Sequence, residues 1–528
     1  MRAFRLGTRD SGCGIRDSTL WRGPLRSAIL VLALVPGLLA QQPAADLIVS
    51  NGKIITVDER FTIAQAVAVR GDRIVAVGTN QAIARLAGPN TRRIDARGRA
   101  VVPGLIDNHM HLLRAGVTWQ QEVRWDGVES RARALDMLRA RAAVAGPGAW
   151  VYTLGGWAMD QFADDRKPFT REELDQAVSG NPVLVQASYY EAFLNSRALQ
   201  ALGVAEKFPS GRVGEDDFRA LVARIPTPSS QEVEASTRFM IRDLNRMGLT
   251  AFGSAGCEQD VLGLYRTWAD RGELSVRVFC ITGQAAGTPQ QVDQILPRIG
   301  QMKLFQGDAF LDHVVYGESV YGPLHDPMFL RSSSPAPEQL LQWRRIATAV
   351  AKARLPLHVH ANLTNTIDAF LDQIEAIHKE YPIKNLRWTL AHVNQLNASH
   401  LARMQRLGMY AAVHPWAVIN GGINHDVFGD SASDMPQLDT IQRSGVSWGF
   451  GSDGSRASQI PPFTTLWWAV TGKMVGGRTV LRQRQTLSRE DALIAYTRKN
   501  AYLISRRTTS ARFRPASSPT CSCSIGTT

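Results

Sequence analysis

The chain has 528 residues, of which 44% are hydrophobic and 20% are charged. A chain of this length and apolar content exceeds one small core and predicts a large globular body. The formal net charge is +13, but a surplus of four positive charges lies in residues 1–40 and another four in residues 506–528, which leaves +5 for the body. Since no Lys/Arg block or interleaved aromatic stripe marks a nucleic-acid groove, we expect no nucleic-acid partner.

The first 40 residues are typical of an export signal. Basic residues up to Arg26 precede the apolar stretch Ser27–Ala40, and the polar residues Gln41 and Gln42 follow directly. The stretch is short for a membrane span, so we expect a secretory signal peptide cleaved after Ala40. An uncleaved anchor is the alternative. We therefore expect an exported protein, periplasmic or secreted, with no stable membrane insertion after cleavage.

Cysteine usage excludes a disulfide scaffold. Of the five cysteines, only Cys257 and Cys280 lie in the body of the chain, and neither has the spacing of a metal ligand. An exported location would permit one bridge.

Residues 41–100 predict short strands. The sequences ADLIVSNGKIITVD and QAVAVRGDRIVAVG contain Asn51-Gly52 and Gly71-Asp72, which are turn signals, and a further short strand is expected near residues 91–95. This segment therefore begins as a hairpin-rich region.

The sequence VVPGLIDNHMH at Val101–His111 predicts a strand buried on both faces that ends in His-x-His. Alternate residues of a strand point the same way, so His109 and His111 can reach one ion while Met110 packs behind them. Two unrelated loop histidines are the alternative interpretation.

Buried strands then alternate with helical stretches, a pattern that predicts a parallel α/β barrel of eight strands. Residues 120–235 are left over and are interpreted as an insertion after the first strand, with Trp157, Tyr189 and Tyr190 as wall or core residues. The eight expected strands are Val101–His109, Leu249–Gly253, Ser275–Ile281, Asp312–Glu318, Pro356–His360, Arg387–Val393, Met409–His414 and Val446–Asp453.

Metal-ligating residue types end five of these strands, at the barrel face where such enzymes keep their chemistry. Four imidazoles and two carboxylates suit one or two divalent metal ions, of which Zn²⁺ is the one we expect. Glu318 would bridge two metals. The expected ligands are His109, His111, Glu318, His360, His392 and Asp453.

Other histidines are expected to have lesser roles. His358 is interpreted as lying deeper in the barrel or behind the ligands. His414 is a pocket residue or a structural histidine. No site role is expected for His313, His325, His378, His400 and His425.

From about Ala45 to Ile504 the chain resembles the amidohydrolase superfamily, and within it the YtcJ-like branch that includes N-substituted formamide deformylases. The resemblance rests on PGLIDNHMH, GGWAMDQF, TREELDQAVSGNPV, FLNSRAL, the His360 and His392 strands, GSDG and SREDALIAYTRKNAYLI. It implies a (β/α)8 metal-dependent hydrolase barrel over residues 101–504 and a small β-sandwich that residues 41–100 begin.

The resemblance also implies hydrolysis of a non-peptide C–N bond in a small molecule such as an N-acyl or N-formyl amine. Asp453 would act as general base and then acid, and His392 would help to hold the oxyanion. In many relatives of this branch the fourth-strand ligand is a lysine that can be carboxylated. Here the aligned strand offers Glu318, and Lys303 upstream is the rival.

Residues 505–528 differ in character from the rest. They contain no acid and no apolar period. Back-translation of Ala511–Thr528 one base earlier permits GSFPPGKLADLLVLDRDY, which is similar to the end of such hydrolases. We therefore hypothesise a single-base shift between about Arg506 and Ala511, which resequencing of these codons tests.

Three functional readings stay open at the level of sequence. The first is a metal-dependent amidohydrolase. The second is an inactive barrel that only binds a small molecule, and the third is a C–O hydrolase or isomerase built on the same site. The sequence is compatible with an oligomer.

Overall fold

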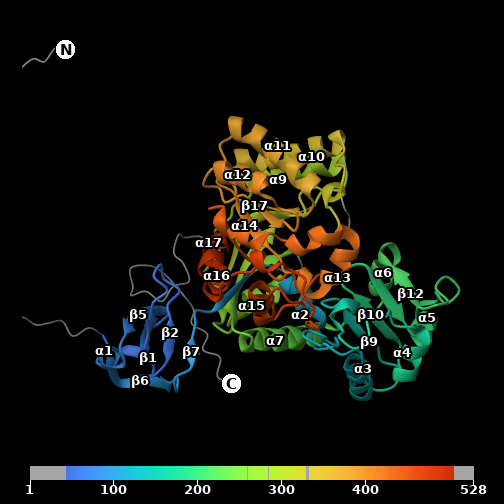
Figure 1. Cartoon of the computed structure of the whole chain (residues 1–528), viewed down its shortest axis with the longest axis horizontal. Helices are drawn as coiled ribbons and strands as arrows, with labels where there is room; N and C mark the ends of the chain where they lie inside the picture. The colour runs from blue at the N-terminus through green and yellow to red at the C-terminus, as the bar shows by residue number, and fades with distance from the viewer. Residues whose placement is uncertain (1–42, 259, 284, 329–331, 505–528) are drawn as a thin grey trace, which may run out of the picture. The chain divides into compact units, whose positions relative to one another are not determined.

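The computed structural model describes residues 43–258, 260–283, 285–328 and 332–504 (Figure 1). The expected signal peptide (residues 1–40) and the altered tail (residues 505–528) lie outside the described residues, so both stay predictions. Among the helices in the described ranges, none combines the length and the apolar character that a membrane crossing needs.

Two small sheets open the described chain. One has the order β5-β4-β1-β6 and the other the order β3-β2-β7. Side chains from both sheets, among them Val49 and Ile54, share one apolar cluster. The elements are β1 (Ala45–Ser50), β2 (Lys53–Ile55), β3 (Ile63–Ala64), β4 (Ala66–Arg70), β5 (Arg73–Gly78), α1 (Asn80–Ala84), β6 (Ala87–Asp95) and β7 (Ala100–Val101).

Eight parallel strands form the barrel, in the order β19-β18-β17-β16-β15-β14-β13-β8. Each overlaps a predicted strand, and the ends agree within two residues except at the start of β8 and the end of β19; the predicted fold class is confirmed. The strands are β8 (Leu105–Met110), β13 (Leu249–Ala255), β14 (Arg277–Thr282), β15 (Leu311–Glu318), β16 (Leu357–Ala361), β17 (Thr389–His392), β18 (Tyr410–Val413) and β19 (Ser447–Phe450).

The first barrel strand begins later than expected. Val101 belongs to β7 and pairs with Ile54 of the small sheet, whereas β8 starts at Leu105. Pro103 has no N–H to donate to a ladder, which separates the two strands. A Cβ on Gly104 would lie 2.3 Å from the side chain of Thr250, so only glycine allows this close approach to β13.

Hydrogen bonds beyond the strand ends bring β8 and β19 together and nearly close the barrel. The N–H of Asp453 donates to the carbonyl of His109 (2.9 Å), and the N–H of His111 donates to the carbonyl of Gly454 (2.8 Å). The side-chain amide of Asn500 also donates to the carbonyl of Phe450, the last residue of β19 (2.6 Å). The two site-bearing segments are therefore fixed to each other through their backbones.

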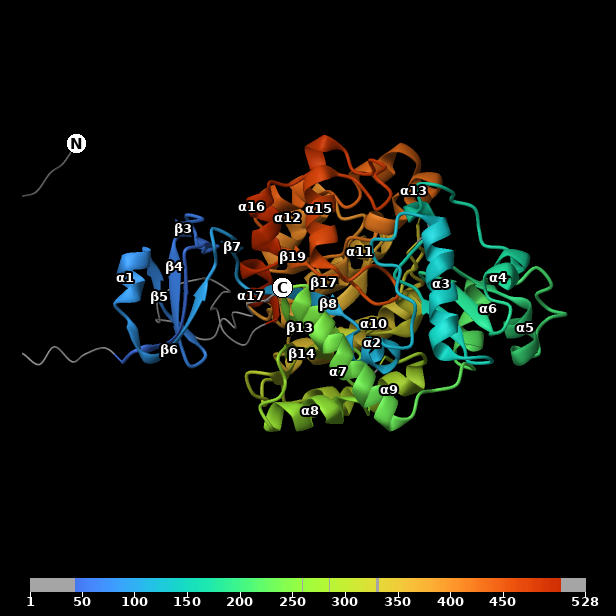
Figure 2. The same cartoon turned by 90° about the horizontal axis from the view of Figure 1, so that it is seen from below.

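Amphipathic helices cover the barrel (Figures 1 and 2). In α11 the buried residues include Ile367, Phe370, Leu371 and Ile374, which is the spacing of one helical face. The helices that accompany the strands are α2 (Leu112–Thr118), α7 (Ser230–Arg246), α8 (Leu262–Asp270), α9 (Pro289–Gln301), α10 (Pro337–Lys352), α11 (Thr364–Glu380), α12 (Ala398–Leu407), α13 (Ala417–Phe428), α14 (Leu438–Arg443), α15 (Pro462–Thr471), α16 (Arg489–Ala495) and α17 (Arg498–Ile504).

The segment between α2 and α7 has a sheet of its own, in the order β12-β11-β10-β9 (Figure 1). Val183 and Val185 of β10 join one apolar cluster and Leu184 joins another, so the sheet is buried on both faces. Its elements are α3 (Arg131–Ala145), β9 (Val151–Leu154), α4 (Arg171–Ala177), β10 (Val183–Ala187), β11 (Glu191–Leu194), α5 (Ser196–Leu202), β12 (Arg212–Gly214) and α6 (Glu215–Val222).

A disulfide joins Cys257, just after β13, to Cys280 in β14, with 5.7 Å between the Cα atoms. Both half-cystines are buried. The bridge links two neighbouring barrel segments near the chemistry-bearing ends of their strands.

Candidate metal centre

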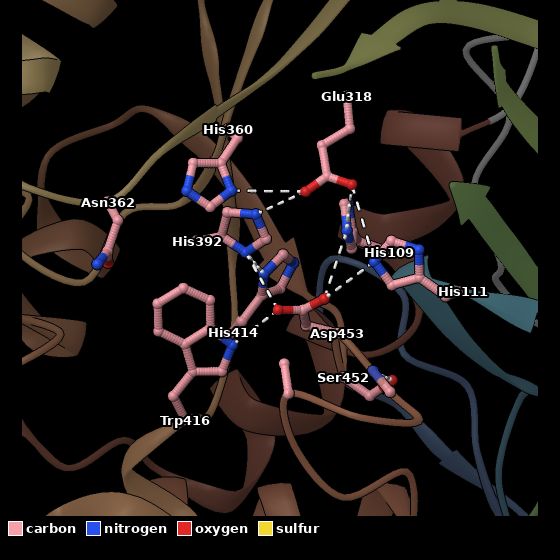
Figure 3. A network of polar contacts seen from close by, with 12 residues as sticks. His109, His111, Glu318, His360, Asn362, His392, His414, Trp416, Ser452 and Asp453 are labelled. Atoms are coloured by element: carbon pink, nitrogen blue, oxygen red, sulfur yellow. Dashed lines mark hydrogen bonds and ion pairs between the residues drawn. The ribbon is translucent and has the colours of Figure 1, made fainter. Parts of the chain in front are cut away.

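The six predicted ligands meet at the carboxyl ends of the barrel strands (Figure 3). His109 lies near the end of β8 and His111 follows it, while Glu318 ends β15. His360 lies in β16, His392 ends β17 and Asp453 follows β19. Because parallel strands present their carboxyl ends at one face, residues far apart in the sequence come together there.

Glu318 lies between two pairs of imidazoles. Its Oε2 atom is 3.4 Å from Nε2 of His109 and 3.8 Å from Nε2 of His111. Its Oε1 atom is 3.0 Å from Nε2 of His392 and 3.5 Å from Nδ1 of His360. Each oxygen of one carboxylate thus faces a different pair, which is the arrangement of a bridging ligand.

Asp453 completes the side that contains the His-x-His pair. Its Oδ1 atom is 3.4 Å from Nε2 of His111 and 3.7 Å from Nε2 of His109. Its Oδ2 atom accepts a hydrogen bond from Nε1 of Trp416 at 2.9 Å and lies 3.5 Å from Nδ1 of His392. Trp416 therefore fixes the orientation of this carboxylate.

Unusual backbone conformations place three of these residues. Gly317 has a φ of +150°, and a Cβ there would lie 1.9 Å from the carbonyl oxygen of His358, so glycine is required next to Glu318. His392 and Asp453 have φ values of 72° and 53°. Such left-handed conformations are uncommon outside glycine and occur often at functional sites.

Burial and mutual charge set the protonation of the cluster. Burial raises the pKa of Glu318, but the neighbouring His109, together with His360 and His392, outweighs it and holds that pKa well below its usual range. Burial also raises the pKa of Asp453, yet the same kind of neighbours lowers it to about 2. Both carboxylates are therefore anions at neutral pH.

The two imidazoles that face Oε1 of Glu318 differ in their pKa. Burial lowers the pKa of His360, but hydrogen bonds to Asp326 and Glu318 raise it to about 10. Burial and the nearby His360 lower the pKa of His392 to about 4. Positive charge in this buried pocket is thus strongly favoured at His360, next to the anions.

The donor set fits metal ions. The Nε2 atom of His109 and the Nδ1 atom of His360 are buried and have no hydrogen-bond partner among the described residues. Both point at the carboxylate of Glu318. Ligand atoms about 2 Å from a zinc-type ion stand roughly 3–4 Å from one another, and the separations above are of this size. Three groups of residues could hold such ions: His109, His111 and Glu318; Glu318, His360 and His392; and His392, His414 and Asp453. Asp453 also faces the first group through Oδ1.

A second layer orients the imidazoles. Nδ1 of His109 lies 2.8 Å from Nε2 of His358, and Nδ1 of His392 lies 2.5 Å from Nδ1 of His414. Nε2 of His360 lies 2.8 Å from Oδ1 of Asp326, whose carboxylate also accepts the N–H of Leu363 at 2.8 Å. Partners of this kind fix the ring and the tautomer of a ligating histidine.

The expectation that His325 has no place at the site is wrong. Its ring stacks on that of His360, with 3.6 Å between the ring centroids. His325 and Asp326 lie in the segment after β15, which crosses to β16. Neither residue shows a periodic signal, and only their position after a site-bearing strand marks them.

Lys303, the rival of Glu318, is exposed in the loop between α9 and β15.

Trp416, which the sequence did not single out, follows His414 at the end of β18 and stacks on His392, with 4.9 Å between the ring centroids. Among the aromatic residues of the insertion, Trp157 is fully buried in the insertion's own core. Tyr189 instead packs against the apolar cluster that contains Trp416, so it lies near the site.

Comparisons with known proteins agree with this geometry. The chain is 25% identical to the N-substituted formamide deformylase of Arthrobacter pascens over 500 residues, which cover 87% of this chain and 90% of that one. It is 28% identical to the putative amidohydrolase YtcJ of Bacillus subtilis over 255 residues, 45% of each chain.

Among solved structures, an uncharacterized metal-dependent hydrolase from Pyrococcus furiosus superposes with a TM-score of 0.63 at 20% identity, covering 89% of this chain and 97% of that one. This likeness shows the fold. A family model described as "Amidohydrolase family" matches residues 92–512. The chain therefore belongs to the amidohydrolase family, as its sequence motifs predicted.

Proposed function

We propose that this protein is a metal-dependent hydrolase that cleaves a non-peptide C–N bond, such as that of an N-acyl or N-formyl amine. The observation that carries the proposal is the carboxylate of Glu318, whose two oxygens face the His109/His111 pair and the His360/His392 pair. The similarity to an N-substituted formamide deformylase supports the choice of bond.

Two divalent ions, which we propose to be zinc, would polarise the scissile carbonyl and lower the pKa of an attacking water to about 7. Asp453 is placed to take the proton of that water. Because Trp416 occupies Oδ2, the Oδ1 atom is the one that faces His111 and accepts it. The same oxygen then returns the proton to the leaving nitrogen.

His392 has a positioning role in this scheme. Its Nε2 atom faces Glu318 and its Nδ1 atom faces Asp453 and His414. The ring thus joins the bridging carboxylate to the proposed base, and its left-handed backbone holds it there. We propose that it also contributes to holding the oxyanion.

We further propose that the protein is exported. The basic residues followed by Ser27–Ala40 support a cleaved signal peptide. The Cys257–Cys280 disulfide supports an oxidising compartment, since such bridges persist there and are rare in reducing ones.

Metal analysis of the purified full chain, together with a screen of N-formyl and N-acetyl amines, tests the function. We expect about two divalent ions per chain, with loss of both metal and turnover in His109→Ala. A matched His400→Ala variant, whose histidine pairs with Asp368 away from the cluster, should keep the metal.

Two outcomes would contradict the proposal. A chain that folds but takes up no divalent ion would be a barrel that only binds its ligand. A metal-loaded chain that cleaves esters or lactones and no amide would be a C–O hydrolase on the same scaffold.

A further inference from the structure

Two arginines follow the metal ligands at equal distances in the sequence. Arg114 lies three residues after His111, within α2, and Arg456 lies three residues after Asp453. The segments that carry them are joined by the hydrogen bond from the N–H of His111 to the carbonyl of Gly454. Side chains of a helix lean toward its N-terminus, so Arg114 is directed back toward His111.

Tyr189 connects these arginines to the site. The guanidinium carbon of Arg114 lies 6.0 Å from the centre of the Tyr189 ring. Tyr189 packs with Trp416 and Ala457, the residue after Arg456. Since Trp416 donates to the carboxylate of Asp453, and the charge of Arg114 acts on Arg456, the cationic groups lie near the proposed base.

Neither arginine has an anionic partner among the residues that the structure describes. The Nε and Nη2 atoms of Arg114 are buried and make no hydrogen bond. Arg456 forms no ion pair with a described residue, and burial followed by the charge of Arg114 lowers its pKa. The nearby Glu122 is already engaged by Thr118 and by Arg124, whose Nη1 lies 3.5 Å from Oε2 of Glu122.

Two adjacent guanidinium groups without a counter-ion are costly, because each loses water without gaining a partner. The flat, forked donor set of arginine matches a carboxylate. We propose that Arg114 and Arg456 bind a carboxylate of the substrate, so that the enzyme acts on amides that carry a free acid, such as N-acylated amino acids. This inference rests on the proposed function and deepens it by naming the substrate class.

The test compares two amides that differ only in the acid, N-acetylphenylalanine (both enantiomers) and N-acetylphenethylamine. We expect kcat/KM of the metal-loaded full chain to favour the carboxylate by at least about tenfold. In Arg114→Met and Arg456→Met that ratio should fall toward one, because a neutral side chain of similar length removes the donors.

Arg219→Met is the matched control. Arg219 also lies near Tyr189, at 5.2 Å from the ring centre, but it is exposed and pairs with Glu215. It should change the ratio by less than about threefold, as for an ordinary surface ion pair. An equal loss in all three variants would overturn the inference.

Calorimetric titration of N-acetylphenylalanine separates this inference from the proposed function. Binding that weakens at least about tenfold in both variants supports the anion site even if neither amide is cleaved. Hydrolysis of both amides without preference would overturn the anion site and leave the function standing. A phosphonate analogue that binds more tightly than the carboxylate by about tenfold would overturn the assignment to a carboxylate.

Discussion

The two sides of Glu318 are built differently. On the His109/His111 side, a third ligand, Asp453, is added, and backbone hydrogen bonds between the segments after β8 and β19 hold the group together. On the His360/His392 side, Asp453 contacts His392 alone, through Oδ2 at 3.5 Å, and among the described residues it is not close to His360. Asp326 and His414 orient these two rings, because each contacts the ring nitrogen that does not face Glu318.

The two sides therefore differ in what positions their ligands. On the His109/His111 side, backbone hydrogen bonds between the segments after β8 and β19 hold the ligands in place. His360, in contrast, is oriented by one acid from a neighbouring segment, so a single substitution can release it. We therefore expect an asymmetric centre in which the His360/His392 side loses its ion first.

The largest effect is expected from Glu318→Gln, which removes the anion that both sides share. Bound divalent ions should fall from about two to at most about one, and kcat/KM should fall by roughly 10³-fold, which corresponds to several kcal/mol of lost stabilisation. Metal analysis and steady-state kinetics measure both. Glu258→Gln, in the segment after β13, is the control and should keep the metal. Full metal content in Glu318→Gln would refute the bridging role.

Asp453→Asn should affect the His109/His111 side most, because Oδ1 faces both of these imidazoles. The amide keeps an oxygen for the cluster but cannot take a proton, so we expect a rate loss of about 10²–10⁴-fold while the His360/His392 side keeps its ion. A pH–rate profile and metal analysis check this. Trp416→Phe, which removes the donor to Oδ2, should reduce the rate by a smaller factor. Unchanged turnover in Asp453→Asn would show that another group is the base.

Asp326→Asn should weaken only the second side. Loss of the charge behind His360 is expected to reduce metal affinity or activity about 10–100-fold. A metal titration with two resolved affinities would show which ion is affected. Asp368→Asn is matched, because Asp368 contacts His400 at 3.0 Å in the same kind of pair away from the site. If the two variants behave alike, Asp326 has no special role.

The smallest effect concerns Asp164, a carboxylate held by N–H groups and a hydroxyl at the start of α3. Burial raises its pKa, but hydrogen bonds from the N–H of Arg131, from Ser130 and from the N–H of Ala132 lower it to about 2. Since this lies below the unfolded value of 3.8, the ionised group stabilises the fold above about pH 4, and that contribution is lost as the pH falls through about 2.

Asp164→Asn should therefore lower the free energy of unfolding by about 0.3–1 kcal/mol at neutral pH, a range suited to an exposed group at a helix N-terminus. Denaturant titrations at several pH values measure this, and the difference from the parent protein should shrink as the pH approaches 2. A difference that is constant with pH would mean that the charge of Asp164 contributes nothing.

Much of the barrel followed from local patterns. Runs such as RWTLAHV and PLHVH are mostly apolar and have a histidine at or next to their last residue. The sequence therefore predicted both the strand and the end of it that bears the candidate ligand. Glu318 was found in the same way, as the last residue of DHVVYGE. The start of the first strand was misplaced at Val101, because β-branched residues there continue through Pro103 and mask the change of sheet.

The residues behind the ligands could not be read in this way. Asp326 and His325 lie in an irregular segment, and their contact with His360 depends on how that segment crosses between two strands. Trp416 is one of twelve tryptophans, and nothing local distinguishes it. Its role exists only because β18 ends beside the segment that holds Asp453.

The sequence by itself determined the order of the eight barrel strands and the six candidate ligands at or just after their ends, because strand burial and metal-ligand residue types both show in short local patterns. The tertiary structure alone decided that the oxygens of Glu318 face two different pairs and that Asp326 lies behind His360. It also brought Arg114 and Arg456 close enough for the charge of one to act on the other, with no ion pair to either among the described residues. These are distances between segments far apart in the chain, and only closure of the barrel sets them.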